Sequence, residues 1–163
     1  MQPVLFDAAI YITALRMGDN AALGLRRIAG GAAEWLSSVV LEELYAGVSE
    51  RNRHAVERLE RDFHTAGRIL VPNLTDWTQT GKVLALLAAK YHYEQIGKGR
   101  LTNDALIATS AGRFGITVIT ANARDFGKLA EFRPFQWRVE KPDTNWDSSA
   151  PAQLTQRWIG VPR

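Results

Sequence analysis

The sequence predicts an α/β fold, a three-layer α/β/α sandwich with a central, mostly parallel sheet of about five short strands. Short apolar segments rich in β-branched residues alternate along the chain with longer segments whose apolar residues recur at helical spacing. Such alternation is typical of β-α-β units, in which helices connect parallel strands. Glycines stand where several of these segments end. With 163 residues, of which 46% are hydrophobic, the chain can form one domain with its own core.

Two strands and four helices are expected in the first half of the chain. The apolar run at 2–6 and the β-branched run at 35–40 predict buried strands. Helices are expected at residues 8–17, 21–28, 41–48 and 49–66. The last of these segments is strongly charged, and Val56, Leu59 and Phe63 recur in it at helical spacing. That spacing indicates a helix with one buried face.

The second half continues the alternation with three strands and three helices. Strands are expected at residues 69–72, 116–119 and 135–139. Helices are expected at residues 76–93, 102–114 and 122–130. After Pro142 the composition shifts to Asp, Ser, Pro, Thr and Gln. We therefore expect a domain at residues 1–140 and an irregular tail at residues 141–163.

Composition excludes several classes of protein. The chain has no cysteine, which excludes disulfides, thiol chemistry and cysteine-ligated zinc. Its apolar runs are far shorter than the roughly 20 residues that a membrane span needs. The apolar amino terminus lacks a preceding basic region and is interrupted by Asp7, unlike a signal peptide. We therefore expect a cytoplasmic protein that does not bind membranes. The net charge of +3 is compatible with a polyanionic partner.

Four acidic residues occupy similar places relative to the predicted elements. Asp7 directly follows the first strand, whereas Glu43, Asp104 and Asp125 are each expected in the first turn of a helix. In a parallel sheet these positions share one edge, where open α/β sheets bind ligands. Carboxylates that meet there repel one another unless one is protonated or a cation lies between them. The acids therefore form a site for a hard cation, Mg²⁺ or Mn²⁺, or each merely complements a helix dipole.

Three segments of the chain have a recognisable pattern, VLFDAAIYITAL at 4–15, SSVVLEELYAG at 37–47 and LTNDALIATSAGRFGITVITANARDF at 101–126. They resemble the PIN domain, and more narrowly the VapC-type toxins of bacterial toxin–antitoxin pairs. The resemblance extends from about residue 4 to residue 129. Its most specific parts are NDALIA at 103–108 and TANARDF at 120–126. A PIN-like α/β/α sandwich is thus expected.

The resemblance also implies which residues form the site. Its catalytic, metal-binding acids correspond to Asp7, Glu43, Asp104 and Asp125, and its supporting polar residues correspond to Thr120 and Asn122. Glu42 adjoins Glu43, but the Leu-Tyr-Ala-Gly that follows matches the family best when Glu43 is the ligand. Where the family usually has two polar residues after the first acid, this chain has Ala8 and Ala9.

A function follows from the same resemblance. It implies an Mg²⁺- or Mn²⁺-dependent endoribonuclease that is the toxin of a toxin–antitoxin pair, forms a homodimer and is neutralised by a small antitoxin. The amphipathic helices at residues 41–63 are the expected surface for that antitoxin. Basic residues near the acids are expected to contact RNA phosphates, or else to form an ordinary solvated surface: Lys98, Arg100, Arg124 and Lys128.

Two other hypotheses compete with this one. The first is a non-catalytic RNA-binding or protein-interaction module that retains the PIN fold, for which Ala8 and Ala9 are the best support. The second is a phosphoacceptor domain of receiver type, which shares the architecture. That class expects a phosphorylatable aspartate after the third strand, and residues 69–72 provide none.

Overall fold

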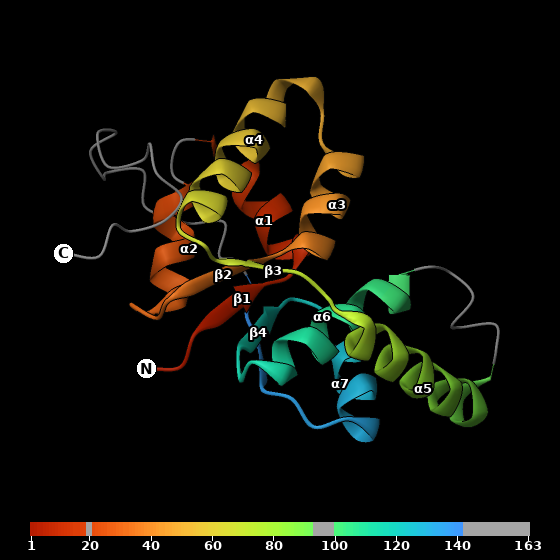
Figure 1. Cartoon of the computed structure of the whole chain (residues 1–163). Helices are drawn as coiled ribbons and strands as arrows, with labels where there is room; N and C mark the ends of the chain where they lie inside the picture. The colour runs from red at the N-terminus through yellow and green to blue at the C-terminus, as the bar shows by residue number, and fades with distance from the viewer. Residues whose placement is uncertain (19–20, 93–99, 142–163) are drawn as a thin grey trace.

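The computed structural model describes residues 1–18, 21–92 and 100–141. Within these residues, one or two helices separate each strand from the next (Figure 1). Their order is β1 Val4–Phe6, α1 Ala8–Leu15, α2 Ala21–Ala29, β2 Glu34–Ser37, α3 Ser38–Gly47, α4 Glu50–Thr65, β3 Ile69–Leu70, α5 Leu74–Tyr91, α6 Arg100–Arg113, β4 Thr117–Thr120, α7 Ala123–Phe132 and β5 Trp137–Val139. Most of the expected tail, residues 142–163, and the expected phosphate contact Lys98 lie outside the described residues.

The five strands form one sheet in which every pair is parallel. Their spatial order is β3-β2-β1-β4-β5, with β1 in the centre. Val4 of β1 pairs with Glu34 of β2 on one side, and Phe6 pairs with Ile119 of β4 on the other. The mostly parallel sheet expected from the sequence is thereby confirmed.

Helices cover both faces of this sheet. In Figure 1, α1 to α4 lie above the strands, and α5 to α7 lie below them. Within the first set α1 packs against α2 and α3, and within the second set α5, α6 and α7 pack against one another. The buried core includes Leu5 and Phe6 of β1 between the two helical layers. The three-layer α/β/α sandwich is therefore confirmed.

The order of the strands reverses its direction beside β1. The chain first builds outward through β2 to β3, and α5 and α6 then carry it back to β4 on the other side of β1. In doubly wound sheets, such a reversal opens a crevice at the carboxyl ends of the two strands concerned. The ends of β1 and β4 are thus the place where this topology favours a binding site.

Two helices differ from the sequence expectation in a way that affects the site. The expected strand at 35–40 ends at Ser37, because the Ser37 hydroxyl accepts the Val39 backbone N–H at 3.2 Å and caps α3. Glu43 is consequently in the second turn of α3. Asp104 is the fifth residue of α6, since that helix already includes Arg100. The expectation that both acids lie in a first helical turn was wrong, whereas Asp125 does lie in the first turn of α7.

None of the helices in the described part of the chain has both the length and the apolar character needed to cross a membrane.

Candidate active site

Asp7 and Thr120 lie side by side at the point where the strand order reverses. Asp7 directly follows β1, and Thr120 is the last residue of the adjacent strand β4. The Asp7 backbone N–H donates to the Ile119 carbonyl at 2.9 Å. This bond continues the ladder between the two strands by one step. Both side chains are buried at the carboxyl edge of the sheet, with 5% of Asp7 exposed.

Both oxygens of the Asp7 carboxyl group have hydrogen-bond donors. Oδ1 accepts the Ala8 backbone N–H at 2.7 Å, and Oδ2 accepts the Thr120 hydroxyl at 2.9 Å. Burial raises the pKa of Asp7, and the bonds from Thr120 and Ala8 offset part of that rise. A nearby cation would favour the charged form of this buried carboxyl group.

Asn122 joins Thr120 to two further acids. Its backbone N–H donates to the Thr120 hydroxyl oxygen at 2.9 Å. Its side-chain Nδ2 donates to Asp125 Oδ2 at 2.9 Å and to Asp104 Oδ2 at 3.5 Å. The Asn122 side-chain oxygen Oδ1 in turn accepts the Asp125 backbone N–H at 3.2 Å, which caps α7. Asp7, Asp104 and Asp125 therefore belong to one hydrogen-bonded network.

Glu43 reaches the same region from the other helical layer. Its Oε1 accepts the Nδ2 amide of Asn103 at 2.8 Å, and Asn103 directly precedes Asp104 on α6. Helices α3 and α6 pack against each other. Glu43 is half-buried, whereas the neighbouring Glu42 points into solvent. The structure thus places all four acids at one edge of the sheet, although Glu43 is joined through Asn103 and not through Asn122.

The donor set has the chemistry that a hard divalent cation requires. Four carboxylates supply oxygen ligands only, and two of them, Asp7 and Asp104, are buried. Among the described residues, however, no group of three or more acidic or histidine side chains is arranged to enclose a metal ion. The Asn122 amide lies between the carboxylates of Asp104 and Asp125. The residues present fit the ion by the chemistry of their oxygen donors, while in this structure the Asn122 N–H groups, and not an arrangement that encloses an ion, satisfy the carboxylates of Asp104 and Asp125.

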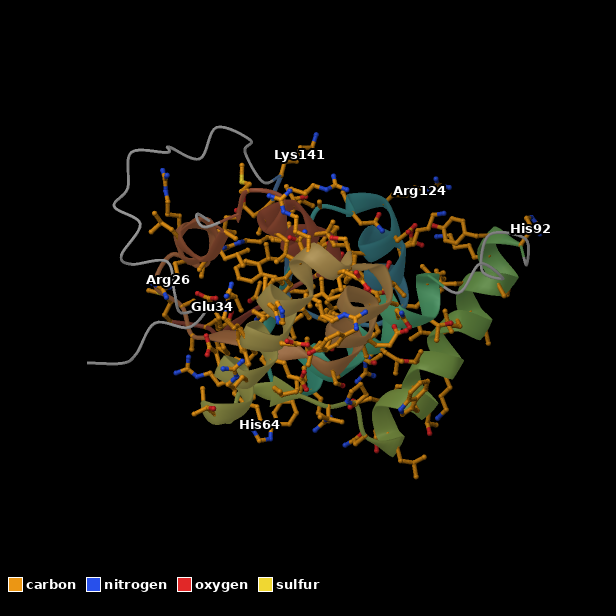
Figure 2. All side chains as sticks on the ribbon, turned by 90° about the horizontal axis from the view of Figure 1, so that it is seen from above. Arg26, Glu34, His64, His92, Arg124 and Lys141 are labelled. Carbon is orange, nitrogen blue, oxygen red and sulfur yellow. The ribbon has the colours of Figure 1, made fainter. Side chains whose placement is uncertain are left out.

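The expected phosphate contacts differ in their surroundings. Arg124 is exposed on the first turn of α7, next to Asp125 (Figure 2). Lys128 is half-buried, and its Nζ lies 4.5 Å from the centre of the Tyr91 ring, a cation–π contact between α7 and α5. The side chain of Arg100 lies outside the described residues.

Asn103 is the site residue that sequence reasoning missed. It belongs to the NDALIA segment, the most specific part of the pattern, but an asparagine one residue before an acid has no distinctive signal by itself. Its role becomes visible only when α3 and α6 are packed together.

A doubly wound parallel sheet with linked carboxylates at its point of reversal defines a class, the α/β proteins with an acidic site at the carboxyl edge. The chain belongs to the PIN-domain family, whose sequence model matches residues 4–132. The family expected from the sequence is confirmed.

Solved structures share the fold. The chain is 22% identical to a protein in the structure of VapBC2 from Rickettsia felis bound to a DNA fragment from their promoter, with a TM-score of 0.61 over 86% of this chain and 100% of that one. DNA-bound VapBC from Salmonella typhimurium gives 22% identity and a TM-score of 0.60 over 85% and 98% of the two chains. VapBC-1 from nontypeable Haemophilus influenzae gives 21% identity and a TM-score of 0.55 over 85% of this chain and 98% of that one. No curated protein of similar sequence was found.

Proposed function

We propose that this protein is a divalent-metal-dependent endoribonuclease and the toxin of a toxin–antitoxin pair. The observation that carries the proposal is the network in which Asp7, Thr120, Asn122, Asp104 and Asp125 are joined at the carboxyl edge of a PIN-domain sheet. The resemblance of the sequence to VapC-type toxins, and the fold shared with proteins solved in VapBC complexes, support the toxin class.

RNA hydrolysis requires that the negative charge of the phosphodiester be offset. When bound to the four acids, Mg²⁺ or Mn²⁺ would neutralise that charge and lower the pKa of an attacking water. Thr120 holds the Asp7 carboxylate in one orientation by donating to Oδ2. Arg124 lies exposed beside Asp125, where it can bind a phosphate of the same strand.

We propose that the antitoxin binds this protein at a surface between α1, α2 and α4. A cavity of about 520 Å³ is lined there by apolar Leu15 and by the cationic side chains of Arg16, Arg51 and Arg58. Part of α4 belongs to the amphipathic region expected from the sequence for this contact. A protein segment with both apolar and acidic side chains would complement this lining. The proposed substrate and partner are cytoplasmic, so we expect the protein there.

We also propose the homodimer that the family resemblance implies. Helix α5 supports it by presenting two large exposed apolar side chains, Leu74 and Trp77, which lie three residues apart on the same face of the helix. Apolar patches of this kind are typical of contact surfaces between proteins.

Cleavage of RNA by the purified protein tests the proposed activity. We expect cleavage in Mg²⁺ or Mn²⁺, and a loss of at least about 100-fold in Asp104→Asn and Glu43→Gln, because each variant removes a charged ligand. Glu42→Gln is the matched control and should retain activity, since Glu42 faces solvent. On overexpression, Asp7→Ala and Asp104→Ala should each relieve growth arrest. Equal cleavage by Asp104→Asn and the unmodified protein would overturn the proposal.

One observation favours a second candidate, the non-catalytic RNA-binding module. Ala8 and Ala9 follow Asp7, so the polar side chains usual at these positions in the family are missing. Ala8 contributes to Asp7 only its backbone N–H. RNA binding without cleavage in any divalent metal would favour this second function.

A further inference from the structure

Glu43 differs from the other acids of the site in how it is held. Asp7 accepts bonds from Ala8 and Thr120, and Asp104 and Asp125 share the Asn122 amide. Glu43 lies on α3, in the opposite helical layer from Asp104 and Asp125. A glutamate also has one more rotatable bond than an aspartate, so more conformational entropy is lost when its carboxylate is fixed.

Asn103 provides a fixed donor to this flexible side chain. Its Nδ2 lies 2.8 Å from Glu43 Oε1, in a half-buried contact between residues far apart in the sequence. Successive residues of a helix point about 100° apart. Asn103 can therefore face Glu43 on α3 while Asp104, the next residue, faces the Asn122 amide. One turn of α6 thus carries both an acid of the site and the donor that holds another.

An amide suits this role better than a charged donor. The Asn103 N–H stabilises the ionised form of Glu43 without neutralising it, whereas a lysine or arginine would compete with a cation for the carboxylate. We propose that Asn103 is a positioning residue that orients the Glu43 carboxylate toward the divalent ion held by Asp104. The inference rests on the proposed function, because it assigns the donor to that same metal site.

Mn²⁺ binding to the purified protein, measured by calorimetry without RNA, tests the proposal. Asn103→Ala should weaken Mn²⁺ affinity about tenfold, the lower end of the loss usual for groups that orient metal ligands. At saturating Mn²⁺ the kcat for RNA cleavage should fall by much less, about threefold or under. Asn103→Gln keeps an amide donor and should recover part of the affinity. Thr102→Ala, which changes the neighbouring half-buried residue, is the matched control and should bind Mn²⁺ normally.

A double-mutant cycle separates positioning from a general structural effect. If Asn103 acts through Glu43, then Asn103→Ala should cause no further loss of Mn²⁺ affinity in a Glu43→Ala background. Circular dichroism and melting temperature should remain unchanged in Asn103→Ala without metal. Additive losses in the cycle, or normal Mn²⁺ affinity in Asn103→Ala, would overturn the inference and leave the nuclease proposal intact. Absence of Mn²⁺ binding in the unmodified protein would overturn both.

Discussion

Two buried acids lie at opposite ends of the sheet and differ in their surroundings. Asp7 follows β1 at the carboxyl edge and is held by hydrogen-bond donors. Glu34 begins β2 at the amino edge, near Arg26 of α2 (Figure 2), and is 6% exposed. Burial raises the pKa of Glu34 to about 7, although the charges of Arg26 and Arg68 lower it in part. Glu34 in turn helps to raise the pKa of the fully buried Tyr11 hydroxyl.

The raised pKa of Glu34 predicts that stability depends on pH. The folded state keeps this proton up to about pH 7, while the unfolded chain loses it near the ordinary value of 4.5. Folding therefore gains from the bound proton at low pH, and that gain disappears as pH rises through 7. Relative to Glu34→Gln, which cannot ionise, the unmodified protein should lose up to about 3 kcal/mol of unfolding free energy between pH 4.5 and 8.

Urea unfolding at a series of pH values measures this difference. Above pH 8 the unfolding free energies of the unmodified protein and of Glu34→Gln should change with pH in parallel, since Glu34 is then ionised in both the folded and unfolded states. Glu42→Gln, an exposed counterpart, should track the unmodified protein throughout. A constant gap between Glu34→Gln and the unmodified protein across the whole range would contradict the assignment.

Individual residues were predictable where their role is tied to a local pattern. Asp104, Asn122 and Asp125 stand in segments whose order of residue types is distinctive, and the structure joins them by hydrogen bonds. Glu34 and Asn103 carry no such pattern. Their roles depend on which segments pack around them, and packing partners distant in the chain cannot be obtained from spacing alone.

At the scale of elements, the order of helices and strands was predictable but some boundaries were not. Hydrophobic period separates strands from helices, and it located β1 and β4 to within a residue or two. It failed at 38–40, where β-branched Val39 and Val40 suggested a strand. There the Ser37 cap outweighs the modest helix propensity of valine, and the chain turns into α3 early. That boundary decides which turn of α3 carries Glu43.

Helices α5 and α6 are joined by a buried acid with two tasks. Asp76 forms a capping box with Asn73 at the start of α5. It also accepts hydrogen bonds from Arg113 at the end of α6, in which Nε donates to Oδ1 at 3.0 Å and Nη2 donates to Oδ2 at 2.7 Å. Deeper between the same helices, the hydroxyls of Thr80 and Thr109 lie 3.0 Å apart. These contacts fix the helix α6 that carries Asp104.

Substitution Asp76→Asn is expected to destabilise the fold by about 2–4 kcal/mol at neutral pH, because it leaves the Arg113 charge without its partner. Burial raises the pKa of Asp76, but the bonds from Arg113 and Asn73 lower it further, so that the net pKa lies below its ordinary value. A lowered pKa contributes stability above the ordinary value of 3.8, and that stability is lost as pH falls through the folded pKa.

Chemical unfolding at pH 7 and at pH 3 measures both effects of Asp76. The difference in unfolding free energy between Asp76→Asn and the unmodified protein should be smaller at pH 3 than at pH 7. Arg113→Lys keeps the charge but loses the bidentate geometry, so it should destabilise the fold less than Asp76→Asn does. If Asp76→Asn unfolds at the same denaturant concentration as the unmodified protein, the ion pair makes no net contribution.

At the scale of the whole molecule, the site is assembled from both helical layers. Asp7 directly follows β1 in the sheet, and Glu43 comes from α3 above the sheet. Asp104 comes from α6 and Asp125 from α7, both below the sheet (Figure 1). More than half of the chain separates Asp7 from Asp125. The four acids can therefore meet only when the sheet has formed and both layers have packed on it, and an unfolded chain offers a cation no comparable site.

Binding of a divalent ion should consequently stabilise the entire fold. A ligand that binds only the folded state at 100 times its dissociation constant adds about 2.7 kcal/mol to the unfolding free energy. Thermal unfolding in rising Mn²⁺ should show a melting temperature that increases with concentration, and Asp104→Asn should abolish the increase. Glu42→Gln should respond as the unmodified protein does, which separates the site from general screening of surface charge. An equal increase in Asp104→Asn would mean that the ion binds elsewhere, because that variant lacks a ligand contributed by the lower layer.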